Sequence, residues 1–255
     1  MSSDENKWKI KSLAKFGLVV KKYNLALEEQ HESPPFIRFS HTSYPGFEAH
    51  LFTIADSSLW NPVIISDSDV VLSGYEKSVD PHEQWSNLFT VMNELMRSLE
   101  QYRQGLKLGI IPSTTWAYYE TSWYRENWEK RSYEMIPAED FLYLVDESIR
   151  PHIKQLNELG FSTTQSCSGL PLDHTDREPY LPYVMFDERT YPRISAHLFT
   201  LADMSGWIPS YGPHNFDIEF RLNSPRDAER LWDRLVGNAH KLAKLLAGYK
   251  EQFVR

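Results

Sequence analysis

The sequence gathers its most reactive side chains in one stretch. Residues 163–169 read Thr-Thr-Gln-Ser-Cys-Ser-Gly and include Cys167, the only cysteine of the chain. Asp173, His174 and Arg177 follow shortly after it. A thiol beside an imidazole is a typical pair for nucleophilic catalysis, and an arginine can hold an anionic group. We therefore expect a site in the loop 167–177, with Cys167, His174 and Asp173 as its candidate catalytic residues.

Two interpretations of these residues stay open. Cys167 is either a nucleophile or thiolate ligand, with His174 or His214 as base or co-ligand, or a buried and inert thiol. The segment Asp173–Arg177 is either a set of acid–base and anion-binding groups or a polar loop with its charges in water. Cysteine, histidine and aspartate are suitable metal ligands, but no CxxC or HExxH spacing is present, so we predict no metal site.

The candidate binding residues surround Cys167. It follows a predicted strand, and Gly169 permits a sharp turn whose amides could form an anion-binding nest. His214 lies in the turn-rich segment 211–215 and is a candidate for a second wall of the site. The expected binding residues are Ser166, Ser168, Gly169, Arg177 and His214.

A repeat in the sequence indicates how the chain positions this stretch. Residues 39–62 align with residues 186–209 at a constant offset of 147, and thirteen of the 24 positions are identical. Self-similarity of this kind points to an internal duplication. His50 and His197 occupy the same place in the two copies, so we interpret both as packing or hydrogen-bonding residues.

A weaker match precedes the repeat. Residues 11–17 align with residues 154–160 at an offset of 143, each as the end of a helix stopped by glycine. The change of offset predicts four additional residues in the second copy, in the loop after Cys167. The same alignment makes Asn24 the equivalent of Cys167. Any functional pocket is therefore expected in the second copy alone.

Hydrophobic spacing predicts the elements of each copy. In the first copy we expect helices at 4–16, 45–58 and 81–104 and strands at 18–26, 36–39, 63–65 and 69–72. In the second copy we expect helices at 138–159, 192–205 and 225–253 and strands at 161–166, 183–186 and 217–222. The fold class is α/β in the broad sense (α+β). Duplicated α-β-β-α-β-α units would be related by a pseudo-twofold axis in a single globule.

The predicted organisation has three parts. The first repeat, residues 4–106, is structural, and the second, residues 138–255, carries the candidate site. Between them, residues 107–137 contain seven tryptophans and tyrosines, too many for a flexible linker. We expect this insert to pack across both repeats, with an alternative in which some of its rings line a ligand cleft.

Composition excludes several classes of protein. A net charge of −8 disfavours extensive binding to nucleic acid or anionic membranes, although lysines near the N-terminus allow limited RNA contact. A single cysteine cannot form an internal disulfide, and no apolar run is long enough to span a membrane. We expect a cytoplasmic protein, either a monomer or a homodimer, whose partner is a small molecule or nucleoside.

The central motif also carries a resemblance. Residues 163–169, preceded by Asn157-Glu-Leu-Gly-Phe161, resemble the TTxSCSG signature of the wybutosine-synthesis tRNA methyltransferase family. The resemblance implies S-adenosylmethionine as cofactor, a modified guanosine of tRNA as substrate, and residues 166–169 in the pocket. That family continues with arginine where this chain has Leu170. The loop with Asp173 and His174 is more similar to uncharacterised archaeal and bacterial proteins with a CSG-type loop.

We therefore expect an enzyme that modifies a nucleoside, an RNA or another small molecule at the loop 167–177, and a transferase if the resemblance holds. The alternative is a non-catalytic module that binds a small molecule or a partner with the same pocket. A protein in which this pocket is closed would serve a structural role.

Overall fold

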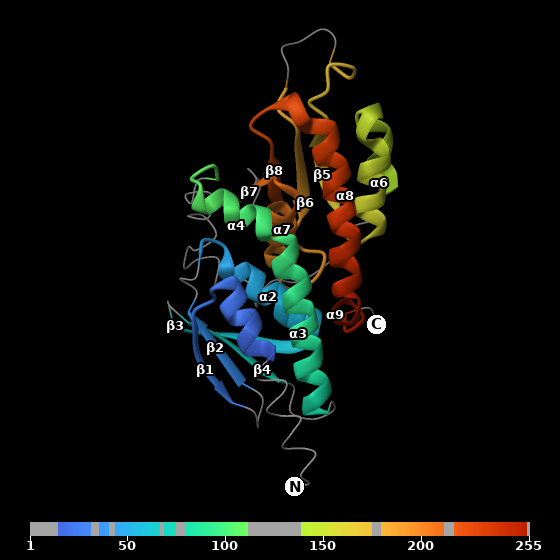
Figure 1. The fold of residues 1–255 in the computed structure, drawn as a ribbon. Coiled ribbons are helices and arrows are strands. Elements are labelled where there is room, and N and C mark those ends of the chain that lie inside the picture. The colour runs from blue at the N-terminus through green and yellow to red at the C-terminus, as the bar shows by residue number, and fades with distance from the viewer. Residues whose placement is uncertain are drawn as a thin grey trace. The chain divides into compact units, whose positions relative to one another are not determined.

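The computed structural model describes residues 15–31, 36–40, 44–66, 69–74, 80–111, 139–174, 180–211 and 217–253. They form an α+β fold with two four-stranded antiparallel sheets, as the fold class predicted (Figure 1). The chain divides into two compact units: residues 1–103 with 245–255, and residues 104–244. Among the described residues, no helix is long and apolar enough to cross a membrane. Nearly all of the insert 107–137 lies outside the described residues.

The first unit contains a sheet with the strand order β1-β2-β4-β3. Residues 15–23 are helical and precede it. The further elements of this unit are β1 (Leu27–His31), β2 (Phe36–Ser40), α2 (Phe47–Ser58), β3 (Trp60–Ser66), β4 (Asp69–Gly74), α3 (Pro81–Ser98) and α9 (Ala247–Lys250), with α4 (Glu100–Lys107) running across the boundary. Alternate residues of β2 and β4 bury completely or nearly so, because one face of the sheet packs on the helices.

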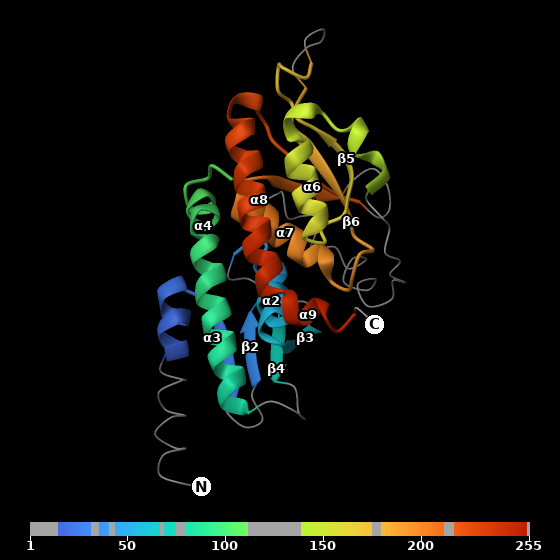
Figure 2. The same ribbon diagram turned by 90° about the vertical axis from the view of Figure 1, so that its right-hand side faces the viewer.

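The second unit repeats this arrangement with the strand order β5-β6-β8-β7. Its elements are the 3-10 helices η3 (Glu139–Leu144), η4 (Glu147–Ile149) and η5 (Pro225–Asp227), the strands β5 (Thr163–Cys167), β6 (Tyr183–Asp187), β7 (Ile208–Tyr211) and β8 (Asp217–Arg221), and the helices α6 (Arg150–Glu158), α7 (Ile194–Ser205) and α8 (Ala228–Leu245). Figure 2 shows α6 and α8 side by side, and the rings of His152 and Trp232 meet between them.

The two units share side-chain geometry as well as strand order. In the first, the Trp60 indole nitrogen donates to the Gln84 carbonyl, and the ring meets Trp85 edge-on at 5.1 Å. In the second, the Trp207 indole donates to the Leu231 carbonyl and meets Trp232 at 4.9 Å. Both prolines at the repeat's end, Pro62 and Pro209, lie on the outermost strands β3 and β7, where the missing N–H costs the ladder least. Common ancestry and the pseudo-twofold axis stay predictions.

The strand pairing corrects our alignment of the two copies. The predicted strand 18–26 is wrong: helix runs to residue 23, and the chain then turns at Asn24, whose φ is 50°. Leu27 of β1 pairs with Phe39 and His31 with Phe36, just as Thr163 of β5 pairs with Phe186 and Cys167 with Tyr183. The ladder position equivalent to Cys167 is therefore His31, and Asn24 corresponds to the helix-ending Gly160.

The same pairing changes the length of the loop that follows. Strands β1 and β2 are joined by the four residues 32–35, and strands β5 and β6 by the fifteen residues 168–182. The second loop is thus longer by eleven residues and not by the four that we predicted. Our error came from aligning Gly17 with Gly160, although Gly17 lies inside a helix.

Three further predictions of elements need correction. Among its described residues, the second unit has four strands where we predicted three, because β7 reaches Tyr211, where we expected a loop. The predicted helix 138–159 is interrupted at Val145 and Asp146, and α6 begins at Arg150. The first helix of the repeat begins at Phe47, after Gly46 with φ 82°, so Pro45 precedes it. The helix ends are set by residues with positive φ that the apolar spacing does not reveal.

Two glycines of the second unit offer a test of this backbone geometry. Gly206 ends α7 with φ 79°, so Gly206→Ala should destabilise the protein by about 1 kcal/mol. Gly237 lies exposed within α8, and a Cβ there meets no atom within 4 Å. Gly237→Ala should instead stabilise by about 1 kcal/mol through helix propensity. Urea unfolding followed by tryptophan fluorescence measures both; shifts of the same sign would contradict the structure.

His50 supplies a pH-dependent test. Burial, followed by the nearby Arg103 charge, lowers the pKa of His50 from 6.5 to about 3. Tyr44 lies with its hydroxyl 3.0 Å from His50 Nδ1. Below pH 6.5, His50 binds a proton in the unfolded chain but stays neutral in the folded chain down to about pH 3. Stability should therefore fall between pH 6.5 and 3, by up to about 5 kcal/mol.

The His50→Gln variant isolates this contribution from that of other titrating groups. We expect the stability difference between the native protein and His50→Gln to change steadily from pH 6.5 downwards, measured by urea unfolding in matched buffers. A difference that stays constant between pH 7 and pH 4 would contradict a neutral, buried His50.

Candidate functional site

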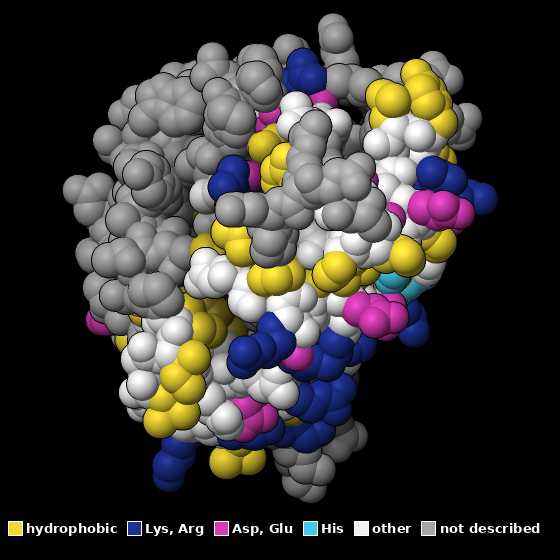
Figure 3. Space-filling model, turned by 90° about the horizontal axis from the view of Figure 1, so that it is seen from above, with side chains coloured by type: hydrophobic (Ala, Val, Ile, Leu, Met, Phe, Trp, Pro, Cys, Tyr) yellow, Lys and Arg dark blue, Asp and Glu magenta, His cyan; other side chains and the backbone are white. Residues whose placement is uncertain are grey.

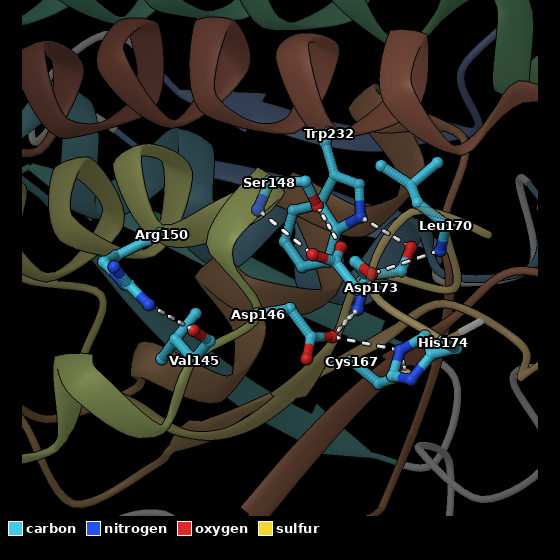
Figure 4. Close-up of polar contacts among 10 residues, drawn as sticks. Val145, Asp146, Ser148, Arg150, Cys167, Leu170, Asp173, His174 and Trp232 are labelled. Atoms are coloured by element: carbon cyan, nitrogen blue, oxygen red, sulfur yellow. Dashed lines mark hydrogen bonds and ion pairs between the residues drawn. The ribbon is translucent and has the colours of Figure 1, made fainter. Parts of the chain in front are cut away.

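Three side chains from separate segments of the second unit converge on one point. Cys167 ends β5, His174 lies in the long loop after it, and Asp146 lies between η3 and η4. The Cys167 Sγ is 3.3 Å from His174 Nε2, and the same nitrogen is 3.2 Å from Asp146 Oδ2 (Figure 4). All three ligand atoms lie within 4.8 Å of one another. The cluster is mostly shielded, with Cys167 buried and the other two side chains about one fifth exposed.

The chain turns sharply directly after Cys167. Gly169 has φ 64°, and a Cβ at this position would lie 2.4 Å from Pro182 Cγ. Glycine is thus required both by the backbone conformation and by the close approach of Pro182. The Ser168 hydroxyl accepts a hydrogen bond from the Leu170 amide, which closes the turn. The motif residues 168–169 therefore shape the backbone that holds Cys167.

Asp146 reaches the cluster because α6, the helix before β5, begins only at Arg150, after Asp146. Pro151 occupies the first turn of α6, where its missing N–H costs no helical hydrogen bond. The preceding residues form only short 3-10 turns. The Asp146 carboxylate, at the start of η4, accepts a 2.7 Å hydrogen bond from the Ser168 amide. A charge-assisted bond of this kind fixes the carboxylate beside the thiol.

A second set of contacts supports the cluster from outside. The Trp232 indole of α8 donates to the Ser168 carbonyl at 3.4 Å. The Asp173 carboxylate accepts hydrogen bonds from the amide and the hydroxyl of Ser148. Figure 4 shows these residues approaching from α8, from the η4 segment and from the loop. Because Asp173 precedes His174, its attachment to Ser148 also orients the imidazole.

Charge and burial act differently on the two acidic groups. Burial raises the pKa of the Cys167 thiol, the Gly169 amide opposes this, and the charges of Asp146 and Asp173 raise the pKa further. For Asp173, burial alone would raise the pKa. Hydrogen bonds from Ser148 and Ser168 and the nearby His174 outweigh it, so the pKa lies below its usual value. The two shifts thus favour the neutral form of the thiol and the charged form of Asp173.

One imidazole nitrogen faces both the thiol and the carboxylate. In a catalytic triad, one ring nitrogen faces the nucleophile and the other faces the carboxylate. Here Nε2 faces both the thiol and Asp146. A single nitrogen is either a donor or an acceptor, so its two contacts share at most one N–H. A cation at the common centre would satisfy all three atoms at once.

The spacing of the three atoms suits a metal ion. Zinc bonds of about 2.0–2.3 Å at tetrahedral angles place neighbouring ligand atoms about 3.3–3.6 Å apart. The two distances from His174 Nε2 are close to this range. Our prediction of no metal site rested on the absence of a sequence spacing, whereas the three groups come from two distant stretches of the chain. Asp146, which we did not predict, supplies the third of the clustered atoms.

The structure places the other predicted site residues in different positions. Ser166 pairs opposite Val184 and so faces the other side of the sheet from Cys167. Ser168 and Gly169 form the turn described above, while Asp173 holds the loop. Arg177 and His214 lie outside the described residues. The one signal for Asp146 in the sequence was Pro151, because a proline in the first helical turn implies a non-helical segment just before it.

Apolar side chains are exposed in the loop that carries His174. Leu172 is 80% exposed, Tyr180 41% and Leu181 44%. The Tyr180 ring lies 5.2 Å from the His174 ring and so borders the cluster. The surface in Figure 3 likewise shows hydrophobic side chains exposed among charged ones. A ligand at the cluster could therefore contact an aromatic and apolar edge.

Comparisons of the chain with protein-family models, curated proteins and solved structures give no match.

Gly169 provides the most direct test of the turn that holds Cys167. Gly169→Ala should cost about 2 kcal/mol or more, because left-handed strain is added to overlap with Pro182. The displaced turn should also speed the reaction of the Cys167 thiol with a disulfide reagent. Gly206→Ala is the matched control, since it carries the left-handed strain without a backbone clash. Equal costs in the two variants, with unchanged thiol reactivity, would refute the geometry.

Proposed function

We propose that Cys167, His174 and Asp146 bind a divalent transition-metal ion, Zn²⁺ in the first place. We further propose that the protein is a metal-dependent enzyme acting on a small molecule. The supporting observation is the convergence of Sγ, Nε2 and a carboxylate oxygen on one point. Sulfur, imidazole and carboxylate ligands together suit zinc, and three protein ligands leave a coordination position for water or substrate.

The reaction class that follows is hydrolysis. A bound divalent cation lowers the pKa of its water ligand toward neutrality. In this site the cation would supply such an activated water for attack on an electrophilic carbon or phosphorus, with the proton passing to the departing group. Cys167, His174 and Asp146 would together hold the metal, and the ring of Tyr180 would border it. A reducing cytoplasm, which we expect from the single cysteine, would keep the Cys167 thiol available as a ligand.

A thiol nucleophile is the second candidate, because Cys167 and His174 are in contact. Two observations favour the metal over this candidate. Burial raises the thiol pKa, whereas a nucleophilic cysteine needs a lowered one. Asp146 also contacts His174 Nε2, the nitrogen that would face only the thiol in a catalytic triad.

Methyl transfer to a nucleoside from S-adenosylmethionine remains a proposal that rests on the TTxSCSG resemblance. Its motif residues 166–169 have structural duties here: a turn, a hydrogen bond to Asp146 and a strand pairing. A nucleoside remains compatible with the exposed ring of Tyr180 as a stacking surface. A non-catalytic binding module, limited RNA contact at the N-terminal lysines and a homodimer also stay proposals. A structural metal would instead require a fourth protein ligand.

Cobalt binding tests the metal proposal. Metal-free protein titrated with Co²⁺ should bind a single ion and develop an intense near-ultraviolet band from thiolate-to-cobalt charge transfer. Cys167→Ser should abolish this band. His174→Ala and Asp146→Asn should weaken binding by about 100-fold or more, because even supporting residues are worth 10–100-fold. His240→Ala, an exposed histidine of α8, is the matched control and should bind like the native chain.

The competing functions give different results in the same preparation. Absence of the band in the native protein would reject the metal proposal. Rapid alkylation of the metal-free thiol at neutral pH, with loss of any activity, would favour the nucleophile. A rise in melting temperature with S-adenosylmethionine, unaffected by Asp146→Asn, would favour the transferase.

A further inference from the structure

A row of side chains extends from Cys167 across the sheet of the second unit. Cys167 of β5 pairs directly with Tyr183 of β6, and Tyr183 pairs directly with Arg221 of β8. Residues opposite one another in antiparallel strands project from the same face. The thiol, the phenol and the guanidinium therefore stand side by side. The opposite face of the sheet carries Val184 and Phe220, which are buried in the core.

Arg221 is oriented and accessible at the end of this row. Its side chain is 55% exposed, and its Nε forms an ion pair with the buried carboxylate of Glu219. The guanidinium also lies 6.0 Å from the centre of the Tyr183 ring. A guanidinium carries five N–H donors, so pairing through Nε leaves the terminal amino groups as donors to a further anion. Glu219 and Tyr183 thus hold Arg221 in place for such a ligand.

The first unit provides an internal comparison. The same ladder positions there hold His31, Phe36 and Ser73. Phe36 has the ring without the hydroxyl, and Ser73 has no positive charge. The pairing is the same, so sheet architecture alone does not require a phenol and a guanidinium. They occur in the unit that also carries the Cys167–His174–Asp146 cluster.

We infer that Tyr183 and Arg221 form an oxyanion subsite beside the cluster, and that the substrate is a small molecule with a phosphate or carboxylate group. This inference rests on the proposed metal-dependent function. Strands lie about 4.8 Å apart, so the Arg221 backbone is about 10 Å from that of Cys167. The anionic group and the bond attacked at the metal are thus about 5–10 Å apart. The planar guanidinium fork matches either oxyanion, and the phenol adds one more donor.

Anion binding to the metal-free protein tests the subsite without its neighbouring metal. Inorganic phosphate and acetate are titrated separately by isothermal calorimetry into the full chain after removal of metal with a chelator. At least one of them should bind to the native chain and equally to His174→Ala. Arg221→Gln should weaken binding by about tenfold or more, since hydrogen bonds to a charged group are lost. Tyr183→Phe should weaken it by a smaller factor.

Arg38 supplies the matched control, because its guanidinium also lies 6.0 Å from an aromatic ring, that of Phe36 in the first unit. Arg38→Gln should leave anion binding unchanged. Tighter binding of phosphate than of acetate assigns a phosphorylated substrate, and the reverse assigns a carboxylate. Binding to neither anion, or equal binding by Arg221→Gln and the native chain, overturns the subsite. The cobalt band reports separately on the metal, so either proposal can fail while the other stands.

Discussion

The indole of Trp232 joins the core of the second unit to its candidate site. Its ring meets Trp207 edge-on at 4.9 Å, in the contact that the first unit makes between Trp60 and Trp85. Its N–H donates to the Ser168 carbonyl, in the turn after Cys167. Because a buried indole N–H needs an acceptor, the packing of the core also fixes the backbone of the site. The Ser168 amide then holds Asp146, so one ring sets the position of two cluster residues.

Among the described residues, the two units share one architecture, and the cluster of thiol, imidazole and carboxylate lies in the second. Strand order, pairing register and the tryptophan contacts agree between them. They differ in the loop that joins the first two strands, which has fifteen residues in the second unit. This loop supplies His174 and its anchor Asp173. A loop on an already paired sheet can take insertions at low cost in free energy, which makes it the natural place for new side-chain chemistry.

Three polar atoms of the second unit gather at one point. The thiol, an imidazole nitrogen and a carboxylate oxygen lie together, and the same nitrogen, Nε2 of His174, faces both of the other two. Supporting hydrogen bonds from Ser168 and Ser148 keep Asp146 and Asp173 in place. Such preorganisation would lower the cost in free energy of binding the proposed cation. A metal ion and an anionic substrate beside Arg221 are consistent with this distribution of charge.

The sequence alone determined the repeat, most of the helices, the class of the fold and the location of Cys167, Asp173 and His174, because these depend on local spacing and identity. It misjudged the strand after residue 18 and the first-copy equivalent of Cys167, since helix ends are decided by single residues with positive φ such as Asn24. Asp146 and the row from Cys167 to Arg221 depended on tertiary structure. The cluster and the row each contain residues that are distant in the chain. Strand pairing brings the row together, and the start of α6 at Arg150 leaves Asp146 free of the helix and beside Cys167.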